Sequence, residues 1–349
     1  MKVAVLVSGG VDSSVALQLL KNQGYDVTAF YLKIWLEDEL SYLGDCPWQQ
    51  DLAYVTAVCE KLTVPLEIVS LQEEYKNDVV AYTVAQVKAG RTPNPDILCN
   101  QRIKFGLFID HFGKSFDKVA SGHYAQVRQN GDKAELFQSP DIIKDQTYFL
   151  SHLSQKQLQK AMFPIGHLQK SEVRQLAEQF DLPNKDRKDS QGICFLGKFK
   201  FTDFIRHHLG VQPGNLVEQE TGKVMGLHNG FWFYTVGQRQ GIRLGGGPWY
   251  VTSKDIKNNI VYISRNYYAD DKSRDTFKVD TIHWLSQADP LITECDVKLR
   301  HGENKNRCFI DRTDEGVTIR LFERDQGIAS GQYAVFYDGD VCLGSGVIE

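Results

Sequence analysis

The stretch that decides the fold is Val3-Ala4-Val5-Leu6-Val7-Ser8-Gly9-Gly10-Val11-Asp12-Ser13-Ser14, near the start of the chain. Its first five residues are aliphatic and mostly β-branched, which predicts a buried parallel strand. Two glycines interrupt this run, and an amphipathic pattern then predicts a helix that ends at Gly24. A glycine turn between a strand's carboxyl end and a helix's amino end exposes backbone N–H groups beside the positive end of the helix dipole. Such a turn is a site for an anion.

This turn is not the common mononucleotide-binding loop, because it lacks the lysine that reaches the β- and γ-phosphates. We therefore expect Mg²⁺ to neutralise the phosphates near Asp12, the nearest carboxylate, and the hydroxyls of Ser8, Ser13 and Ser14 to add donors. The stretch Ser8 to Ser14 resembles the signature of the N-type ATP pyrophosphatase (PP-loop) superfamily. That resemblance implies that the turn binds the pyrophosphate of ATP and that a substrate is adenylated by attack at the α-phosphate. An ordinary tight turn of any doubly wound fold is the alternative.

The chain has 349 residues, of which 42% are hydrophobic, enough for two or three packed domains. No apolar run approaches the ~20 residues that span a bilayer. The first apolar segment already leads into the glycine turn, so we expect neither a signal peptide nor a membrane segment. Seven cysteines are too few for a disulfide scaffold of this length, which favours a cytoplasmic protein.

The net charge of −4 excludes a globally basic nucleic-acid binder, but two stretches are locally basic. The stretch from Lys88 to Lys104 holds four basic residues and one acid, and the stretch from Lys185 to Arg206 holds six and three. Each stretch also contains one cysteine. A charged run is usually only a solvated face, and this alternative stays open for either stretch taken alone.

Up to about residue 207 the pattern alternates between strands and helices, which predicts a doubly wound parallel α/β domain. Further strands are expected over 27–34, 66–69 and 119–121, and a helix over 51–62. An antiparallel hairpin over 125–137, turning at Asn130-Gly131, interrupts this order.

Beyond about residue 211 period-two strands replace the helices. We expect three domains: the α/β domain over 1–207, a small β-rich module over 208–270, and a closed β-barrel or sandwich over 277–349. Asp338-Gly339 predicts a tight hairpin between the last two strands.

The cysteines fall into two groups. Cys59 on an apolar helix face, and Cys295, Cys308 and Cys342 in alternating strands, are expected to be buried hydrophobes, and Cys46 is expected to be incidental.

The two remaining cysteines have the surroundings of reactive thiols. Cys99 precedes Asn100, which we expect to cap a helix running to Gly113, so Cys99 would lie just outside a helix N-terminus near cations. Cys194 lies between two glycines among lysines. Helix ends and cations lower a thiol's pKa. The spacing of cysteines and histidines matches no metal-ligand motif, so we expect no zinc site.

A more specific resemblance extends along the whole chain. The ordered motifs SGGVDSS, GRTPNPDILCNQRIKF, SGHYA, KDQTYFL, RKDSQGICFLG, YTVGQRQGI and SGQYAVFYDGDVCLGSGVI resemble those of the bacterial tRNA-specific 2-thiouridylases. The resemblance implies replacement of the C2 oxygen of a wobble uridine in tRNA by sulfur, with ATP and Mg²⁺ as cofactors. It also implies a tRNA-contacting role for the central module. The implied partners are tRNA, a cysteine desulfurase or relay protein that supplies persulfide sulfur, and a cellular thiol reductant.

The resemblance also implies roles for individual residues. The nucleotide would be held by Leu6, Val7, Ser8, Gly9, Gly10, Val11, Asp12, Ser13, Leu32 and Gly122. The target base would meet Asn94, Pro95 and Asp96. Other tRNA contacts would come from His123, Lys144, Asp145, Gln146, Arg300, His301 and Gln332. Cys99 would be the nucleophile and Cys194 the persulfide carrier, and the two would end as a disulfide.

The chain departs from the family's pattern at Gln126 and Gln240, where relatives often carry Arg and Lys. Each change removes one potential phosphate contact, so we expect it to affect the strength of tRNA binding and not the chemical steps. Asp96 is a candidate acid or base, or only caps the local turn. Two other functions stay open from sequence: a PP-loop ligase or amidotransferase acting on a small molecule, and a non-catalytic nucleotide- or RNA-binding module.

Overall fold

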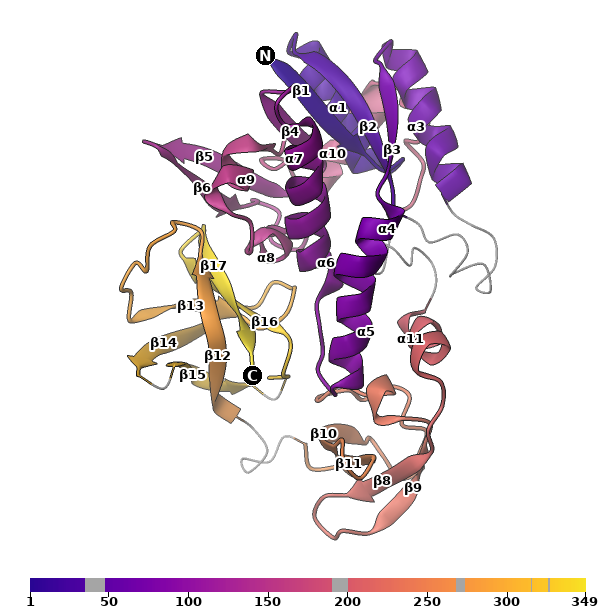
Figure 1. The fold of residues 1–349 in the computed structure, drawn as a ribbon, viewed down its shortest axis with the longest axis vertical. Coiled ribbons are helices and arrows are strands. Elements are labelled where there is room, and N and C mark those ends of the chain that lie inside the picture. Colours follow the sequence, from indigo (N-terminus) through magenta and orange to yellow (C-terminus); the bar gives the residue numbers. More distant parts are fainter. Residues whose placement is uncertain (35–47, 190–199, 268–273, 315, 326) are drawn as a thin grey trace.

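The first domain is built on a five-stranded parallel sheet with the order β3-β2-β1-β4-β7 (Figure 1). The structure, a computed structural model, describes residues 1–34, 48–189, 200–267, 274–314, 316–325 and 327–349. The strands are β1 (Lys2–Val7), β2 (Asp26–Lys33), β3 (Leu66–Ser70), β4 (Lys118–Ser121) and β7 (Ala161–Met162). The four strands predicted from sequence are confirmed with small shifts at their ends, whereas the two-residue β7 was not predicted.

Helices cover both faces of this sheet, as a doubly wound fold requires. Along β1, Val3, Val5 and Val7 share a buried cluster with α1 (Val11–Asn22) and α3 (Trp48–Leu62). The alternate residues Ala4 and Leu6 pack instead with Phe108 of α7 (Phe108–Phe112). Because side chains alternate across a strand, a continuous aliphatic run is what a strand buried on both faces needs.

The remaining helices of this domain extend away from the sheet or pack around its edge. They are α4 (Gln72–Tyr75), the π-helical η2 (Lys76–Val80), α5 (Ala81–Lys88), α6 (Pro95–Leu98), the π-helical η3 (Cys99–Leu107), α8 (Thr147–Leu150), α9 (Gln155–Lys160) and α10 (Lys170–Gln179). In Figure 1 the helical column from α4 to α5 runs from the sheet towards the other modules.

The predicted hairpin is confirmed as β5 (Ala125–Asn130) and β6 (Lys133–Gln138), paired antiparallel. It does more than interrupt the first domain, because β6 pairs with β17 (Val341–Ile348) of the C-terminal barrel. Leu136 and Cys342 are register partners in this pairing. The hairpin therefore joins the first domain to the barrel through a shared sheet.

The central module follows α11 (Phe201–Leu209) and has a small sheet of its own with the order β10-β11-β8-β9. Its strands are β8 (Gly214–Glu218), β9 (Val224–His228), β10 (Tyr250–Asp255) and β11 (Ile260–Ser264), with a short helical turn η4 (Phe231–Phe233). Its core gathers aromatic side chains, among them Phe231, Tyr234 and Trp249. The β-rich character predicted from the sequence is confirmed.

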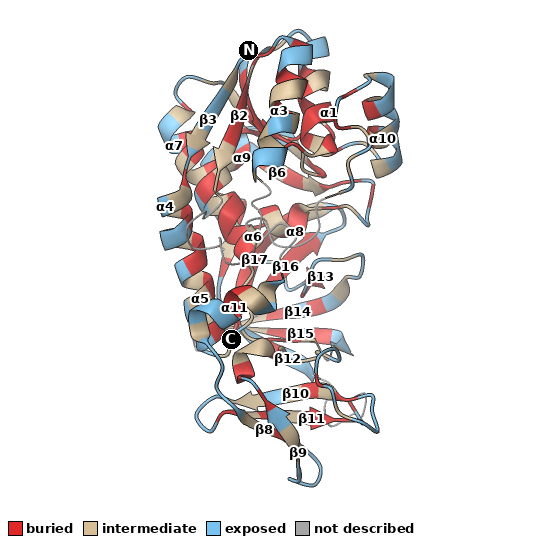
Figure 2. Cartoon of the chain, turned by 90° about the vertical axis from the view of Figure 1, so that its right-hand side faces the viewer, coloured by how far each residue is buried: buried red, intermediate tan, exposed pale blue. Residues whose placement is uncertain are grey.

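The C-terminal sheet closes into a barrel because β12 pairs with both β15 and β17. The barrel strands are β12 (Arg274–Trp284), β13 (Glu294–Lys298), β14 (Asn306–Thr313), β15 (Gly316–Asp325), β16 (Tyr333–Asp338) and β17. The expected hairpin joins β16 to β17, and Gly339 there has φ +55°. Figure 2 shows buried positions running through the parallel sheet and through the barrel strands.

Candidate functional site

The glycine turn connects β1 to α1, as predicted from the sequence. Gly9 has φ +75°, and a Cβ there would lie 2.6 Å from the carbonyl oxygen of Asp51, so only glycine fits. Gly10 is the N-cap of α1 and no side chain caps this helix end. The N–H groups of the first turn are therefore available to an anion.

The loop serines hydrogen-bond within the loop itself, and their role as donors to an anion stays a prediction. The hydroxyls of Ser13 and Ser14 each donate to the carbonyl oxygen of Gly10 at 3.1 Å, and the N–H of Ser8 donates to Ser13 Oγ. These contacts shape the loop from within. Gly122, at the end of β4, packs against the same turn: a Cβ there would lie 2.6 Å from the backbone nitrogen of Ser13. The structure thus brings Gly122 to the loop, as the resemblance implied.

Two cations that were not predicted from the sequence flank the glycine turn. Lys170, the first residue of α10, places Nζ 2.6 Å from Asp12 Oδ1. Arg187 donates to the carbonyl oxygen of Gly9 at 3.0 Å and forms an ion pair with Asp51. Lys170 lies far along the chain from the glycine turn, so no local spacing could reveal it. It supplies in space the positive charge that the loop lacks in sequence.

Asp12 is held on two sides in this structure. Besides Lys170, the hydroxyl of Tyr124 donates to Asp12 Oδ1 at 3.0 Å. Burial, together with the neighbouring Asp12 charge, raises the pKa of Tyr124, so this hydroxyl keeps its proton. Among the described residues no cluster of histidine, cysteine, aspartate or glutamate is suited to hold a metal ion by itself.

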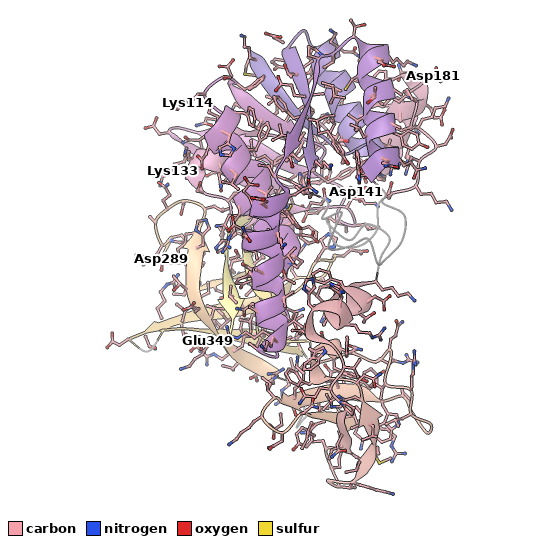
Figure 3. The ribbon with its side chains drawn as sticks, turned by 45° about the vertical axis from the view of Figure 1, so that its right-hand side comes forward. Lys114, Lys133, Asp141, Asp181, Asp289 and Glu349 are labelled. Atoms are coloured by element: carbon pink, nitrogen blue, oxygen red, sulfur yellow. The ribbon has the colours of Figure 1, made fainter. Side chains whose placement is uncertain are left out.

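Asp189 gathers the neighbouring cations into one network. Its carboxylate lies 2.8 Å from Nζ of both Lys144 and Lys170, and it also pairs with Arg174. Although partial burial alone raises the pKa of Asp189, hydrogen bonds from the two lysines outweigh it and hold the pKa well below its usual range. Asp141, labelled in Figure 3, accepts the backbone N–H of Lys170 at 2.9 Å and so fixes the start of α10.

The segment predicted to meet the target base is the start of a helix. Asn94 is the N-cap, and its Oδ1 accepts the N–H groups of Asp96 and Ile97 at 3.2 Å each. Pro95 occupies the first turn, a position where proline is favoured. Ile97 of this helix and Tyr148 of α8 lie in the same buried cluster. The Asn94 side-chain oxygen is thus used within the chain to start the helix.

The expected cap at Asn100 is wrong, and with it the place of Cys99. The helix begins at Pro95 and continues through Cys99 into η3. Cys99 is fully buried in a cluster with Leu98 and Ile103, not exposed outside a helix end. Asn94 and Pro95 form the stronger start signal, and the side chain of Asn100 instead donates to the carbonyl oxygen of Phe149 at 3.1 Å.

The other cysteines divide as the sequence indicated wherever the structure describes them. Cys59, Cys295, Cys308 and Cys342 are buried, and burial raises the pKa of Cys59 to about 11. Cys295 and Cys308 are register partners across β13 and β14. Cys46 and Cys194 lie outside the described residues, so the proposed pairing of Cys194 with Cys99 stays a prediction.

The residues expected to contact tRNA are placed very differently from one another. Asp145 is 1% exposed and pairs with the buried Lys298 of the barrel, which puts its carboxylate out of reach of a tRNA here. Gln146 accepts the backbone N–H of Tyr124. His301 is exposed and stacks on Phe149, with ring centroids 4.7 Å apart.

The other expected contacts are more accessible or only partly covered. Lys144 forms the ion pair with Asp189, and Arg300 pairs with Asp325 on the surface. His123 hydrogen-bonds Ser121, and burial together with Lys104 lowers its pKa well below the usual value, so the ring is neutral at pH 7. The Oε1 atom of Gln332 is buried and has no hydrogen-bond partner among the described residues. Leu32 packs against the core beside β1.

The basic stretch from Lys185 to Arg206 is partly neutralised by the chain's own acids. Lys185 pairs with Glu178 and Asp181, Arg187 with Asp51, and Arg206 with Asp203. Its charge is therefore a weaker argument for RNA binding than the sequence indicated. No helix in the described part of the chain is both long and apolar enough to cross a membrane.

Three family models match the chain in order. Residues 1–198 match the model described as tRNA methyl transferase HUP domain, residues 202–265 the tRNA methyl transferase PRC-barrel domain, and residues 274–348 the aminomethyltransferase beta-barrel domain. Together these matches account for nearly the whole length.

Similar full-length proteins carry one name. The tRNA-specific 2-thiouridylase MnmA of Parabacteroides distasonis is 48% identical over 100% of this chain and 99% of its own length. The enzyme of the same name from Porphyromonas gingivalis is 46% identical, again over 100% and 99% of the two chains. Among solved structures, the U34-tRNA thiolase NcsA of Methanococcus maripaludis is 16% identical, with a TM-score of 0.36 over 59% of this chain and 64% of that one. That score is too low to carry an argument, whereas the full-length identities show that the chain belongs to the family of tRNA-specific 2-thiouridylases.

Proposed function

We propose that this chain is a tRNA-uridine 2-sulfurtransferase, which replaces the C2 oxygen of a wobble uridine by sulfur and converts ATP to AMP and diphosphate. The observation that carries the proposal is an uncapped glycine turn flanked by Lys170 and Arg187 in a chain that also holds Asn94 to Cys99. Membership of the 2-thiouridylase family supports the substrate.

The glycine turn would bind the phosphates of ATP. The first-turn N–H groups of α1 would meet phosphate oxygens, and Lys170 lies close enough to exchange its contact with Asp12 for one with phosphate. Asp12, once released by Lys170, would be a ligand for Mg²⁺, which stabilises charge on the phosphates. Gly122 packs against the turn after the end of β4, and Leu32 of β2 is proposed to contact the nucleotide.

The chemistry requires activation of a poor leaving group. Attack of the uridine O2 on the α-phosphate releases diphosphate and leaves an O-adenylated base, and donors fixed at the phosphates stabilise the developing charge. A persulfide on Cys194 would then attack C2 and expel AMP. Attack of the Cys99 thiolate on Sγ of Cys194 would break the bond from that atom to the sulfur now carried by the base. This step would release 2-thiouridine and leave a Cys99–Cys194 disulfide, which a cellular thiol reopens.

Asp96 is proposed as the acid or base at the target base. Asn94 already caps the helix, so the carboxylate of Asp96 is not needed as the cap. Anticodon-loop bases are single-stranded and leave their stack at low cost, which suits a buried nucleophile such as Cys99. A cysteine desulfurase or a relay protein would supply the sulfur, and the reducing cytoplasm would supply the reductant.

The test uses the purified full chain with ATP, Mg²⁺, sulfide and an unmodified tRNA that has a wobble uridine. Nuclease digestion and mass spectrometry should show 2-thiouridine only when ATP is present and only when position 34 is uridine, with the same tRNA carrying cytidine there as the matched control. AMP formation without 2-thiouridine would instead indicate a PP-loop ligase with another acceptor. ATP binding without AMP would indicate a non-catalytic module.

A further inference from the structure

A turn of the barrel lies directly against the segment that precedes the target-base residues. The N–H of Thr92 donates to the carbonyl oxygen of Ser330 at 2.7 Å, which joins the two segments through backbone alone. In Figure 1 the barrel lies beside α5 and α6, the helices on either side of this segment. We call residues 328–333 the barrel turn.

The barrel turn is held rigidly by its own domain. Gly331 donates its N–H to the carbonyl oxygen of Ile348, and the N–H of Ile348 donates to the carbonyl oxygen of Gln332, both at 2.8 Å. Ile328 and Ala329 are buried, and Ile328 belongs to the barrel core. The turn therefore presents a fixed surface to the catalytic domain.

Gly331 is the point of closest approach. It has φ +87°, and a Cβ at this position would lie 2.8 Å from Arg91 Cβ and 2.9 Å from the backbone nitrogen of Thr92. Real Cβ atoms do not approach backbone so closely, so any side chain here displaces the segment that leads to Asn94.

A second contact reaches the same helix through α8. The Tyr148 hydroxyl donates to the carbonyl oxygen of Tyr333 at 3.1 Å. Tyr148 also shares a buried cluster with Ile97, in the first turn of the helix that carries Cys99. The side chain of Tyr148 thus links the barrel turn to the start of this helix.

We propose that the barrel turn 328–333 positions the target-base segment for catalysis, with Gly331 and Tyr148 as its positioning residues. Two contacts hold the segment from both ends: the backbone hydrogen bond at Thr92, and Tyr148, which bonds Tyr333 and shares a buried cluster with Ile97. The barrel then acts on the chemical step through Asp96 and Cys99, and not only as a surface for tRNA. This inference rests on the proposed thiolation of uridine.

The first test compares Gly331→Ala with Gly339→Ala. Both glycines have positive φ and lie in turns of the same barrel, but a Cβ at Gly339 meets no atom within 4 Å. Gly331→Ala should lower kcat for 2-thiouridine formation about 10- to 100-fold with an unchanged KM for tRNA, because a small displacement of reacting groups costs that much. The kcat of Gly339→Ala for 2-thiouridine formation should stay within about 3-fold of the kcat of the unaltered chain. Equal kcat values for the two variants, or a raised KM with unchanged kcat, would overturn the proposal.

Tyr148→Phe gives a second test should Gly331→Ala fail to fold. It removes only the hydroxyl that bonds the carbonyl oxygen of Tyr333, and Tyr337→Phe is its control, since Tyr337 is also buried and its hydroxyl bonds Thr147 instead. Only Tyr148→Phe should lower kcat; an equal fall in both, or in neither, contradicts the inference. A lack of 2-thiouridine with the unaltered chain would count against the proposed function itself, and is seen before any variant is compared.

Discussion

At the scale of single residues, the proposed phosphate site depends on charge brought from distant parts of the chain. The glycine turn would supply backbone donors, whereas Lys170 from α10 and Arg187 from the segment after it would supply the cations. Asp12 and Asp189 both pair with Lys170. A lysine held between two carboxylates keeps its place until an anion competes for it.

Replacing Lys170 by Met should lower the rate of tRNA-dependent AMP formation about 100- to 1,000-fold, the usual cost of removing one fixed donor to a charged transition state. Lys170→Arg should retain part of the rate because the charge is kept. Release of AMP can be followed with labelled ATP. Lys156→Met, which removes an exposed ion pair with Asp110, is the control. A normal rate for Lys170→Met would exclude Lys170 from the phosphate site.

With persulfide sulfur supplied by a cysteine desulfurase in place of free sulfide, Cys99→Ser should abolish 2-thiouridine formation while tRNA-dependent AMP formation persists. A serine hydroxyl cannot displace the base-bound sulfur from Cys194, but the substitution leaves the ATP site unchanged. Cys59→Ala is the matched control: Cys59 is also buried, in a cluster behind the sheet. Mass spectrometry of digested tRNA and an AMP assay on the same samples give both readouts. Full thiolation by Cys99→Ser would remove Cys99 from the mechanism.

Local patterns predicted the residues whose roles are local. Gly9 and Gly10 lie where a strand meets a helix, and that signal is contained in a few neighbouring residues. Lys170 is separated from Asp12 by most of the domain, and nothing in its helix distinguishes it from an ordinary surface lysine. The burial of Asp145 was missed for the same reason, since its partner Lys298 belongs to another domain.

At the scale of elements, the helix carrying Cys99 shows how competing start signals are resolved. Asn94 followed by Pro95 and Asn100 are both acceptable caps in sequence. The earlier signal prevails because Asn94 satisfies two N–H groups and Pro95 needs none, which leaves Asn100 free to bond Phe149. The consequence is that Cys99 is enclosed within a helix.

The contact between the segment that follows α8 and the barrel predicts a dependence of stability on pH. His152 hydrogen-bonds Ser345 of β17 and faces His283 of β12, Tyr333 of β16 and the charge of Arg102. Burial, with smaller effects of His283 and Arg102, lowers the pKa of His152 from 6.5 to about 4. The unfolded chain therefore takes up this proton near pH 6.5 and the folded chain only near pH 4.

The free energy of unfolding should accordingly be unaffected by His152 above about pH 7 and fall as the pH decreases towards 4, by at most about 3 kcal/mol. Urea denaturation at several pH values measures this. His152→Asn keeps a polar group near Ser345 but cannot titrate, so its stability should fall less across the same window. An equal fall in both proteins would show that other groups carry the effect.

At the scale of the whole molecule, the sequence predicted the modules better than their connection. Alternating patterns identified the α/β fold, the small β-rich module and the barrel, because each is a property of consecutive residues. The pairing of β6 with β17 and the contact of Thr92 with Ser330 join segments about two hundred residues apart, which no local period records.

The ion pair of Lys298 and Asp145 joins the barrel to the first domain, and both of its side chains are almost fully enclosed. Lys298→Met should destabilise the protein by about 3–5 kcal/mol, because it leaves the Asp145 charge buried without its partner. Lys156→Met, at an exposed pair, should cost less than about 1 kcal/mol. Denaturant titration measures the free energy of unfolding of both variants. An equal loss of stability in the two would show that the buried pair does not join the domains.

The most direct measurement is the ratio of AMP to 2-thiouridine formed in a single turnover. The full chain, in excess over a tRNA with a wobble uridine, is mixed with ATP, Mg²⁺ and sulfide, and both products are quantified in each quenched sample. One AMP should form per 2-thiouridine, with AMP formation lost when position 34 is cytidine. AMP that forms equally with cytidine at position 34, or 2-thiouridine that forms without AMP, would contradict adenylation of the target base by this chain.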